Sequence, residues 1–280
     1  MKALLAIDQS TSATKAIVFD TEGNVLSRAS RDHRQIHPRP GWVEHDPEEI
    51  WQNTLDACRN VLAGAPKAEI SGVCITNQRE TILAFDRATG RPLMNALVWQ
   101  DRRGDAICTE LRTAGHDPAV NAKTGLKIDS YFSASKIAWM MRHAPEVAGA
   151  VRAGSGAIGT IDSYLVHRLT NGKTFATDST NASRTLLFDI RAMGWDVDLC
   201  ALFDCPIDAL PEVRDATARF GETTLGGLLA SPVPVCGVIG DSQAALFAHR
   251  CFNVGEGKVT LGTGSSVLLN LGHELPDASD

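Results

Sequence analysis

The chain has 280 residues, of which 44% are hydrophobic, and a formal net charge of -6 at pH 7. This length and composition suffice for one large globular domain or two ordinary ones. The negative charge is not offset by a clustered basic face, which excludes a nucleic-acid backbone as the expected partner and favours a small-molecule substrate. The apolar runs are too short to span a bilayer and no secretory leader opens the chain, so we expect a cytoplasmic protein without membrane contact.

Seven cysteines are spread along the chain without a close CxxC pair. This spacing is not that of a zinc site or a redox dithiol, and the odd number does not suit a disulfide framework. We therefore expect buried thiols in a reducing compartment.

The first thirty residues alternate between apolar and polar positions as strands do. Residues 3–8 ("ALLAID"), 15–20 ("KAIVFD") and 25–30 ("VLSRAS") are separated by polar turns, which predicts an antiparallel meander. A helix is predicted next, because Asp46 suits its N-cap and Pro47 its first turn.

Strands and helices interleave in the middle of the chain. The runs "ISGVCIT", "TILAFD" and "NALVWQD" predict strands, and helices are expected at residues 102–113, 133–143 and 161–169. This alternation indicates an α/β fold with a mixed sheet, in which ligands usually bind outside the carboxyl ends of the strands. The polar residues that follow the strands are therefore the candidate site.

Two hairpins near the ends of the chain share one pattern. "LLAIDQSTSATKAIVFD" and "GKVTLGTGSSVLLNLG" each contain an apolar strand, a Gly/Ser/Thr turn and a second apolar strand. They suggest two related halves that face each other. Few residues follow the second hairpin, so we expect the second half to be barely begun where the chain stops.

The turns of these hairpins are candidate phosphate sites. In the first, residues 9–14 offer successive N–H groups and hydroxyls, which suit either an anion-binding concavity or an ordinary turn. Asp8, beside that turn, could hold Mg2+ directly or through water. In the second, Gly262, Thr263 and Gly264 become a second clamp if the two hairpins face each other. No GxxxxGK[ST] motif is present, which excludes a P-loop.

The stretch "ITNQRET" places donors and acceptors directly after an apolar strand. Arg79 and Glu80 together suit vicinal hydroxyls, or form a solvated charge pair. Trp99 can stack on the carbon-hydrogen groups of a polyol or belong to the core. Tyr131 is a third hydroxyl contact or an aromatic residue at a helix start.

Asp241 lies where the strand of "VIGDSQAAL" gives way to a helix. A Gly-Asp pair before a helix is typical of an N-cap. A carboxylate at a strand-to-helix junction also projects into the ligand crevice, where it can accept the proton of an attacking hydroxyl. The local pattern leaves both readings open.

Several long motifs occur together and in a characteristic order. They are "DQSTSATKAIVFD", "GWVEHDPEEIW", "ITNQRET", "ALVWQDRR", "TNASRTLLFDI", "LPEVR", "GDSQAALF" and "LGTGSSVLLN". In these motifs the chain resembles the FGGY carbohydrate kinases, and most closely the glycerol kinases among them. The resemblance runs from residue 1 to about residue 272.

The resemblance implies an ATP-dependent kinase of the actin/hexokinase/heat-shock ATPase superfamily, which transfers phosphate to a primary hydroxyl of glycerol or a similar small polyol. Two ribonuclease-H-like domains would close around substrate and nucleotide, with ATP and Mg2+ as cofactors. Residues 1–250 would form the substrate-binding domain, and residues 251–280 the first hairpin of the nucleotide-binding domain. Family members are often dimers or tetramers, which leaves a homo-oligomer open.

The motif matches also imply residue roles. Polyol-binding positions fall on Arg79, Glu80, Trp99, Tyr131, Asp241 and Ser242. Asp241 is in addition the implied general base. Cofactor-binding positions fall on Thr11, Ser12, Ala13, Lys15 and Thr263, and Mg2+-linked acids on Asp8 and Asp241.

The chain departs from the family pattern at a few positions. Ser242 replaces a glutamine and Ser266 an aromatic residue, which would enlarge and hydrate the pocket for a longer polyol or a ketose. Ser10 replaces a glycine and Lys15 an arginine, which predicts weaker nucleotide binding because the bidentate fork is lost. The segment 226–234 replaces a loop that binds fructose bisphosphate in some relatives, so we expect no such feedback.

The implied adenine and ribose contacts come chiefly from the second domain. We therefore expect the 280-residue chain alone to be a weak or inactive kinase. A polyol-binding module without catalysis stays open as an alternative. An actin-like or chaperone-type ATPase is disfavoured, because "NQRE" and Trp99 suit a hydroxylated substrate.

Overall fold

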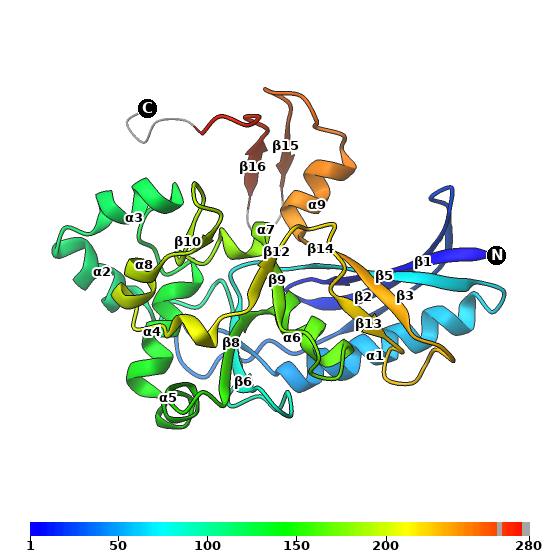
Figure 1. The fold of residues 1–280 in the computed structure, drawn as a ribbon, viewed down its shortest axis with the longest axis horizontal. Helices are drawn as coiled ribbons and strands as arrows, with labels where there is room; N and C mark the ends of the chain where they lie inside the picture. Colours follow the sequence, from blue (N-terminus) through cyan, green and yellow to red (C-terminus); the bar gives the residue numbers. More distant parts are fainter. Residues whose placement is uncertain (262–264, 276–280) are drawn as a thin grey trace.

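A six-stranded mixed sheet forms the centre of the computed structural model, which describes residues 1–261 and 265–275 (Figure 1). The strand order is β13 (Gly221–Thr223), β14 (Val233–Gly240), β5 (Glu69–Asn77), β1 (Lys2–Gln9), β2 (Ala13–Asp20) and β3 (Val25–Asp32). β1, β2 and β3 form the predicted antiparallel meander, whereas β5 and β14 run parallel to β1. The expected mixed α/β fold is confirmed.

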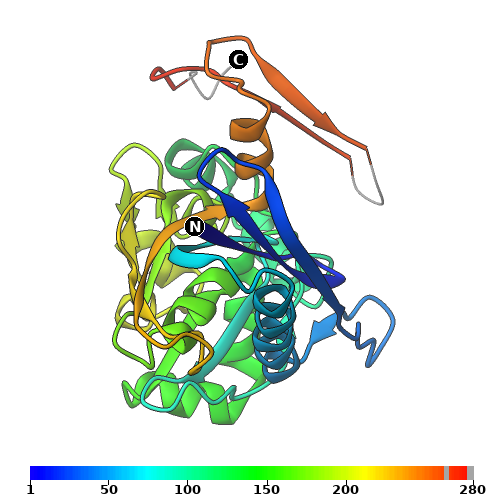
Figure 2. The same cartoon turned by 90° about the vertical axis from the view of Figure 1, so that its right-hand side faces the viewer.

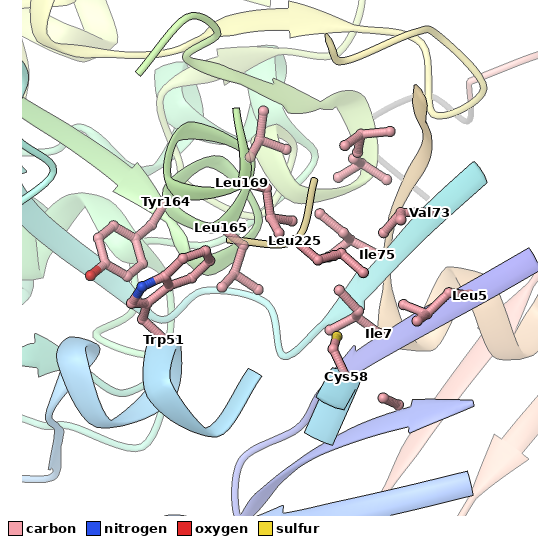
Figure 3. Packing of buried hydrophobic residues seen from close by; sticks show 14 of the residues in the cluster. Leu5, Ile7, Trp51, Cys58, Val73, Ile75, Tyr164, Leu165, Leu169 and Leu225 are labelled. Atoms are coloured by element: carbon pink, nitrogen blue, oxygen red, sulfur yellow. The ribbon is translucent and has the colours of Figure 1, made fainter. Parts of the chain in front are cut away.

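One face of this sheet is covered by α1 (Pro47–Gly64) and α6 (Ile161–Leu169), as Figure 3 shows. α1 begins as the sequence predicts: Asp46 is the N-cap, and its Oδ1 accepts a hydrogen bond from the Glu48 amide at 2.9 Å. The alternate, inward-facing side chains of the strands pack on these helices, among them Leu5, Ile7, Val73 and Ile75. Period-two burial therefore fixes which face of each strand points into this core.

A second core lies beside the first. Its antiparallel sheet has the order β4 (Glu44–His45), β7 (Ala96–Leu97), β6 (Ile82–Asp86) and β8 (Gly156–Thr160). Helices pack around it: α2 (Asp105–Thr113), α3 (Asp117–Thr124), α4 (Ser133–His143), α5 (Pro145–Arg152) and α8 (Val197–Leu202). None of the helices in the described ranges is long and apolar enough to cross a bilayer.

Shorter elements complete the chain. They are β9 (Ala176–Asp178) with β12 (Glu212–Arg214), β10 (Phe188–Asp189) with β11 (Gly194–Trp195), α7 (Ser179–Ala182) and the 3-10 turn η1 (Ile207–Ala209). After β14 come α9 (Asp241–Ala248) and the predicted second hairpin, β15 (Gly257–Thr260) with β16 (Ser266–Leu269). Figure 2 shows this hairpin standing beyond the main body, joined to it through α9.

Three local expectations are corrected. The strand expected from "NALVWQD" is reduced to Ala96–Leu97, and the helix expected at 102–113 begins only at Asp105. A buried ion pair explains both changes, because Arg103 turns inward and contacts Asp101 at 2.8 Å. Not every cysteine is buried: the half-buried ones are Cys74, Cys236 and Cys251.

Asp162, at the start of α6, is a fully buried carboxyl group. Thr177 Oγ1 donates a hydrogen bond to its Oδ2 at 2.6 Å. Burial, and next the negative charge of Asp178, raise the pKa of Asp162 to about 7. The folded chain thus keeps a proton that the unfolded chain loses near pH 4.

We expect this proton to make stability fall as pH rises from about 4 to about 7, by at most about 4 kcal/mol. Asp162→Asn cannot ionise and keeps an acceptor for Thr177, so its unfolding free energy should lack this slope and exceed that of the wild type at pH 8. Urea unfolding of both proteins at pH 4.5, 6 and 8 measures the difference. Parallel pH profiles would contradict the assignment.

Candidate active site

The candidate site lies at the carboxyl ends of three neighbouring parallel strands. β5 lies between β1 and β14, and Asn77 is paired with Gln9 on one side and with Gly240 on the other. The three strands therefore end side by side, and the residues that follow them begin at the same edge of the sheet. This is where ligands bind in open α/β sheets.

A cleft of about 570 Å³ opens at this edge and extends to the second hairpin. Its described lining is Thr11, Gln78, Arg79, Glu80, Trp99, Tyr131, Arg184, Asp241, Ser242, Gln243, Thr260, Ser265, Ser266, Val267 and Leu268. The turn of the first hairpin and both strands of the second thus border the same space. All six predicted polyol-binding residues border this cleft.

Arg79 connects the end of β5 to the start of α9. Its Nε lies 3.3 Å from Asp241 Oδ1, and its Nη2 donates to Ser242 Oγ at 3.1 Å. The Arg79 side chain is 8% exposed and that of Asp241 44% exposed, so the guanidinium forms the floor and the carboxylate faces the opening. Such a pair orients the carboxylate.

Asp241 is not the N-cap of α9. Gly240 occupies that position, and Asp241 is the first helical residue, with Oδ1 accepting from the Ser242 amide at 2.6 Å. The negative charge at this helix start is favourable to the helix dipole. The interpretation of Asp241 as the N-cap of this helix is therefore wrong.

Glu80, three residues after the end of β5, is held in an unusual backbone conformation. Its φ of 61° is in the left-handed region, which non-glycine residues seldom adopt. Its side chain is 2% exposed and accepts from Arg184 Nε at 2.6 Å. The strained turn and the ion pair together fix a buried carboxylate at the cleft wall.

Two aromatic side chains also line the cleft. Trp99 and Tyr131 have ring centroids 5.6 Å apart in an edge-on arrangement. Trp99 Nε1 donates to Thr11 Oγ1 at 3.0 Å, which ties the wall to the first hairpin. Burial, and next the charge of Glu80, raise the pKa of the Tyr131 hydroxyl, so it remains a hydrogen-bond donor at neutral pH.

A buried polar network supports the strand ends from behind. Gln78 Nε2 donates to Gln9 Oε1 at 3.0 Å, and Asn77 Nδ2 donates to Asn181 Oδ1 at 2.9 Å. Thr180 Oγ1 accepts from the Gly240 amide at 2.8 Å. The last residues of β1, β5 and β14 are thus cross-linked by groups that satisfy one another.

Two functional candidates were missed by the sequence analysis. Arg184 belongs to the quoted motif "TNASRTLLFDI" but received no role, because its partner Glu80 is distant in the chain. Lys136 lies fully buried in α4, and its Nζ donates to the carbonyls of Ser130, Tyr131 and Phe132. Lys136 thereby holds the segment that carries Tyr131, although burial lowers its pKa to about 8.

Fewer of the predicted cofactor-binding residues than of the polyol-binding residues border the cleft. Thr11 borders the cleft, whereas the described lining does not include Asp8, Ser12, Ala13 or Lys15. Lys15 Nζ lies 3.2 Å from Asp8 Oδ2, and both side chains are partly exposed. Thr263 lies outside the described residues. Within those residues no three His, Cys, Asp or Glu side chains gather into a metal-binding group.

Comparison with known proteins establishes the family. The N-terminal domain of the FGGY family of carbohydrate kinases matches residues 3–248. The chain belongs to this family.

Individual relatives agree with that assignment. The chain is 48% identical to glycerol kinase 1 of Thermotoga maritima over 99% of its own length and 56% of that protein, and 51% identical to the glycerol kinase of Rhodospirillum rubrum. The structure of Plasmodium falciparum glycerol kinase with ADP superimposes with a TM-score of 0.92 at 38% identity, covering 96% of this chain and 54% of that one. The chain thus spans about half the length of the relatives it matches.

Gly240 is required by the close approach of Arg79. A Cβ at position 240 would lie 2.6 Å from Arg79 Cδ and 2.8 Å from its Cγ. We expect Gly240→Ala to lower the unfolding free energy by about 1–3 kcal/mol, because the guanidinium must move off Asp241. Gly149→Ala is the control, since its Cβ would meet nothing within 4 Å. Equal denaturant midpoints for the two variants would refute the contact.

Lys136 can be tested in the same way. Lys136→Met leaves three buried carbonyls without their donor, and we expect it to destabilise the chain by about 3 kcal/mol or more. Lys127→Met, at an exposed lysine, should change stability by less than about 0.5 kcal/mol. Guanidinium unfolding compares the two. A loss of similar size in both would argue against the role of Lys136.

Proposed function

We propose that the chain is the substrate-binding part of an ATP-dependent kinase that phosphorylates a primary hydroxyl of glycerol or a similar small polyol. The observation that carries this proposal is the cleft in which Arg79, Glu80 and Asp241 meet the Trp99–Tyr131 wall. The relatives named glycerol kinase support the substrate class. We also propose that residues 1–250 form the substrate-binding domain and that residues 251–280 begin the nucleotide-binding domain.

The cleft suits a polyol because it offers both hydrogen-bonding directions beside an apolar surface. Arg79 and Tyr131 donate, while Glu80 and Asp241 accept. A hydroxyl both donates and accepts, so adjacent hydroxyls can satisfy such a pair of groups. The rings of Trp99 and Tyr131 would lie against the carbon-hydrogen side.

Asp241 is the proposed general base. Its Oδ1 already accepts from Arg79 Nε and the Ser242 amide. No described residue donates to Oδ2, which leaves that oxygen for the proton of the attacking hydroxyl. The side chain faces the opening, where a phosphoryl donor would approach.

The phosphate side of the reaction is proposed to lie between the two hairpins. Thr11 and Ser12 at the first turn and Thr263 at the second would contact phosphate oxygens through N–H groups and hydroxyls, with Ala13 and Lys15 next to them. Asp8 would hold Mg2+ directly or through water, with Asp241 as the second Mg2+-linked acid, because Mg2+ takes one or two carboxylates together with phosphate oxygens. Bound Mg2+ neutralises charge on the transferred group, and the residues supply positioning.

The substrate is less sharply defined than the chemistry. Ser242 and Ser266 both border the cleft and present small hydroxyl side chains. They leave room for a polyol longer than glycerol, or for a ketose. A polyol-binding module without turnover is the second candidate, because the chain spans only about half the length of its relatives.

Asp241→Asn separates binding from catalysis. We expect calorimetry to give polyol affinity within about threefold of the wild type, because the amide keeps an acceptor and the Arg79 floor remains. Turnover in a coupled assay for ADP should fall by a factor on the order of 10² or more. Turnover is measured on the 280-residue chain. Where the open reading frame continues past Asp280, it is also measured on the longer protein.

Asp208→Asn, at an exposed acid outside the described lining of the cleft, is the matched control and should alter neither quantity. A panel of glycerol, erythritol, dihydroxyacetone and a pentitol ranks the substrates. In a form whose wild type turns over ATP, unchanged turnover in Asp241→Asn would disprove the base assignment. Polyol affinity without ATP turnover in every form would favour the binding module.

A further inference from the structure

Two cysteines face each other across neighbouring strands outside the cleft. Val73 of β5 pairs with Val235 of β14, and Ile75 pairs with Val238. One residue of β5 therefore lies opposite two residues of β14, which is a β-bulge. Cys74 is the single residue on β5 and Cys236 is the first of the two on β14. The two cysteines therefore lie opposite each other on neighbouring strands.

Both thiols point to the open face of the sheet. Their neighbours Val73 and Val235 are fully buried in the core on the other face, whereas Cys74 and Cys236 are half-buried. Side chains alternate between the faces of a strand, which places the two sulfurs on one side.

Glycines leave room for these sulfurs. A Cβ at Gly72 would lie 2.8 Å from Cys236 Sγ, and a Cβ at Gly237 would lie 3.3 Å from Cys74 Sγ. Each thiol therefore rests on a glycine of the opposite strand. Burial, and next the neighbouring Cys236, raise the pKa of the Cys74 thiol to about 12, which disfavours Cys74 as the sulfur that attacks first.

We propose that Cys74 and Cys236 form a reversible dithiol–disulfide site that reacts with a peroxide. The Cys236 sulfur attacks the peroxide, the O–O bond breaks, and a sulfenic acid on Cys236 and water result. The other thiol then attacks the sulfenic sulfur, forming the S–S bond and releasing a second water. Two thiols and one hydrogen peroxide thus give one disulfide and two waters.

The fold explains why the bond is reversible. Cβ atoms joined by a disulfide lie about 3.8 Å apart, closer than the roughly 4.8 Å between neighbouring strands. The bond must pull the strands together and is strained, and strained disulfides are the readily reduced ones. The bulge at Cys236 supplies the local adjustment that a regular ladder lacks.

The pair also lies in line with the cleft. Cys74 lies on β5, five residues before Arg79, and Cys236 lies on β14, five residues before Asp241. The bond therefore joins the two strands whose ends carry the Arg79–Asp241 contact. This proposal concerns the thiols alone and does not depend on the proposed kinase activity.

The folded full chain is treated with hydrogen peroxide, alkylated and digested. We expect a linked peptide pair containing Cys74 and Cys236, with loss of two hydrogens, and its disappearance on treatment with dithiothreitol. The internal control is Cys200 with Cys205, which are close in the chain but only 3% exposed each and should remain reduced. Cys74→Ser and Cys236→Ser, tested singly, should each abolish the linked pair.

Time-resolved alkylation of the untreated wild type needs no variant and keeps the test valid if a serine variant unfolds. There Cys74 and Cys236 should be modified before the four buried cysteines. Separate oxidation of Cys74 and Cys236 to sulfinic acids, disulfides between chains, or a lack of reaction at both thiols would each overturn the proposal.

Discussion

The register of three parallel strands is the constraint on which the rest of the site depends. Because β5 pairs with β1 on one side and β14 on the other, the three strands end side by side at Gln9, Asn77 and Gly240. Residues far apart in the chain are thereby delivered to one edge without any long loop. A shift of one residue would exchange the two faces of a strand and send its polar end away from the cleft.

Ion pairs then convert this shared edge into a chemically ordered surface. Arg79 and Arg184 each hold one acid of the cleft, Asp241 and Glu80 respectively. Removing such charges from water is costly, so the pairs persist only because neighbouring groups complete their hydrogen bonds. Their value lies in orientation, because each pair fixes a carboxylate at the border of the cleft.

The elements with regular patterns were predictable, and those set by distant partners were not. The helices Ser133–His143 and Ile161–Leu169 have the bounds that their periodicity indicates, and Asp46 caps α1 as expected. The strand through Trp99 was overestimated, because a long-range ion network around Arg103 ends it early. The predicted roles of the site residues stay predictions, although the cleft brings most of them together.

By itself the sequence determined the α/β class, the paired hairpins, the family and the short list of polar strand ends, because these follow from local periodicity and contiguous motifs. Only the tertiary structure decided that Arg184 holds Glu80, that Lys136 supports Tyr131, and that Cys74 lies opposite Cys236. Each of these contacts joins residues on different elements or turns of the chain. Their partners are fixed by strand register and packing, which no local pattern encodes.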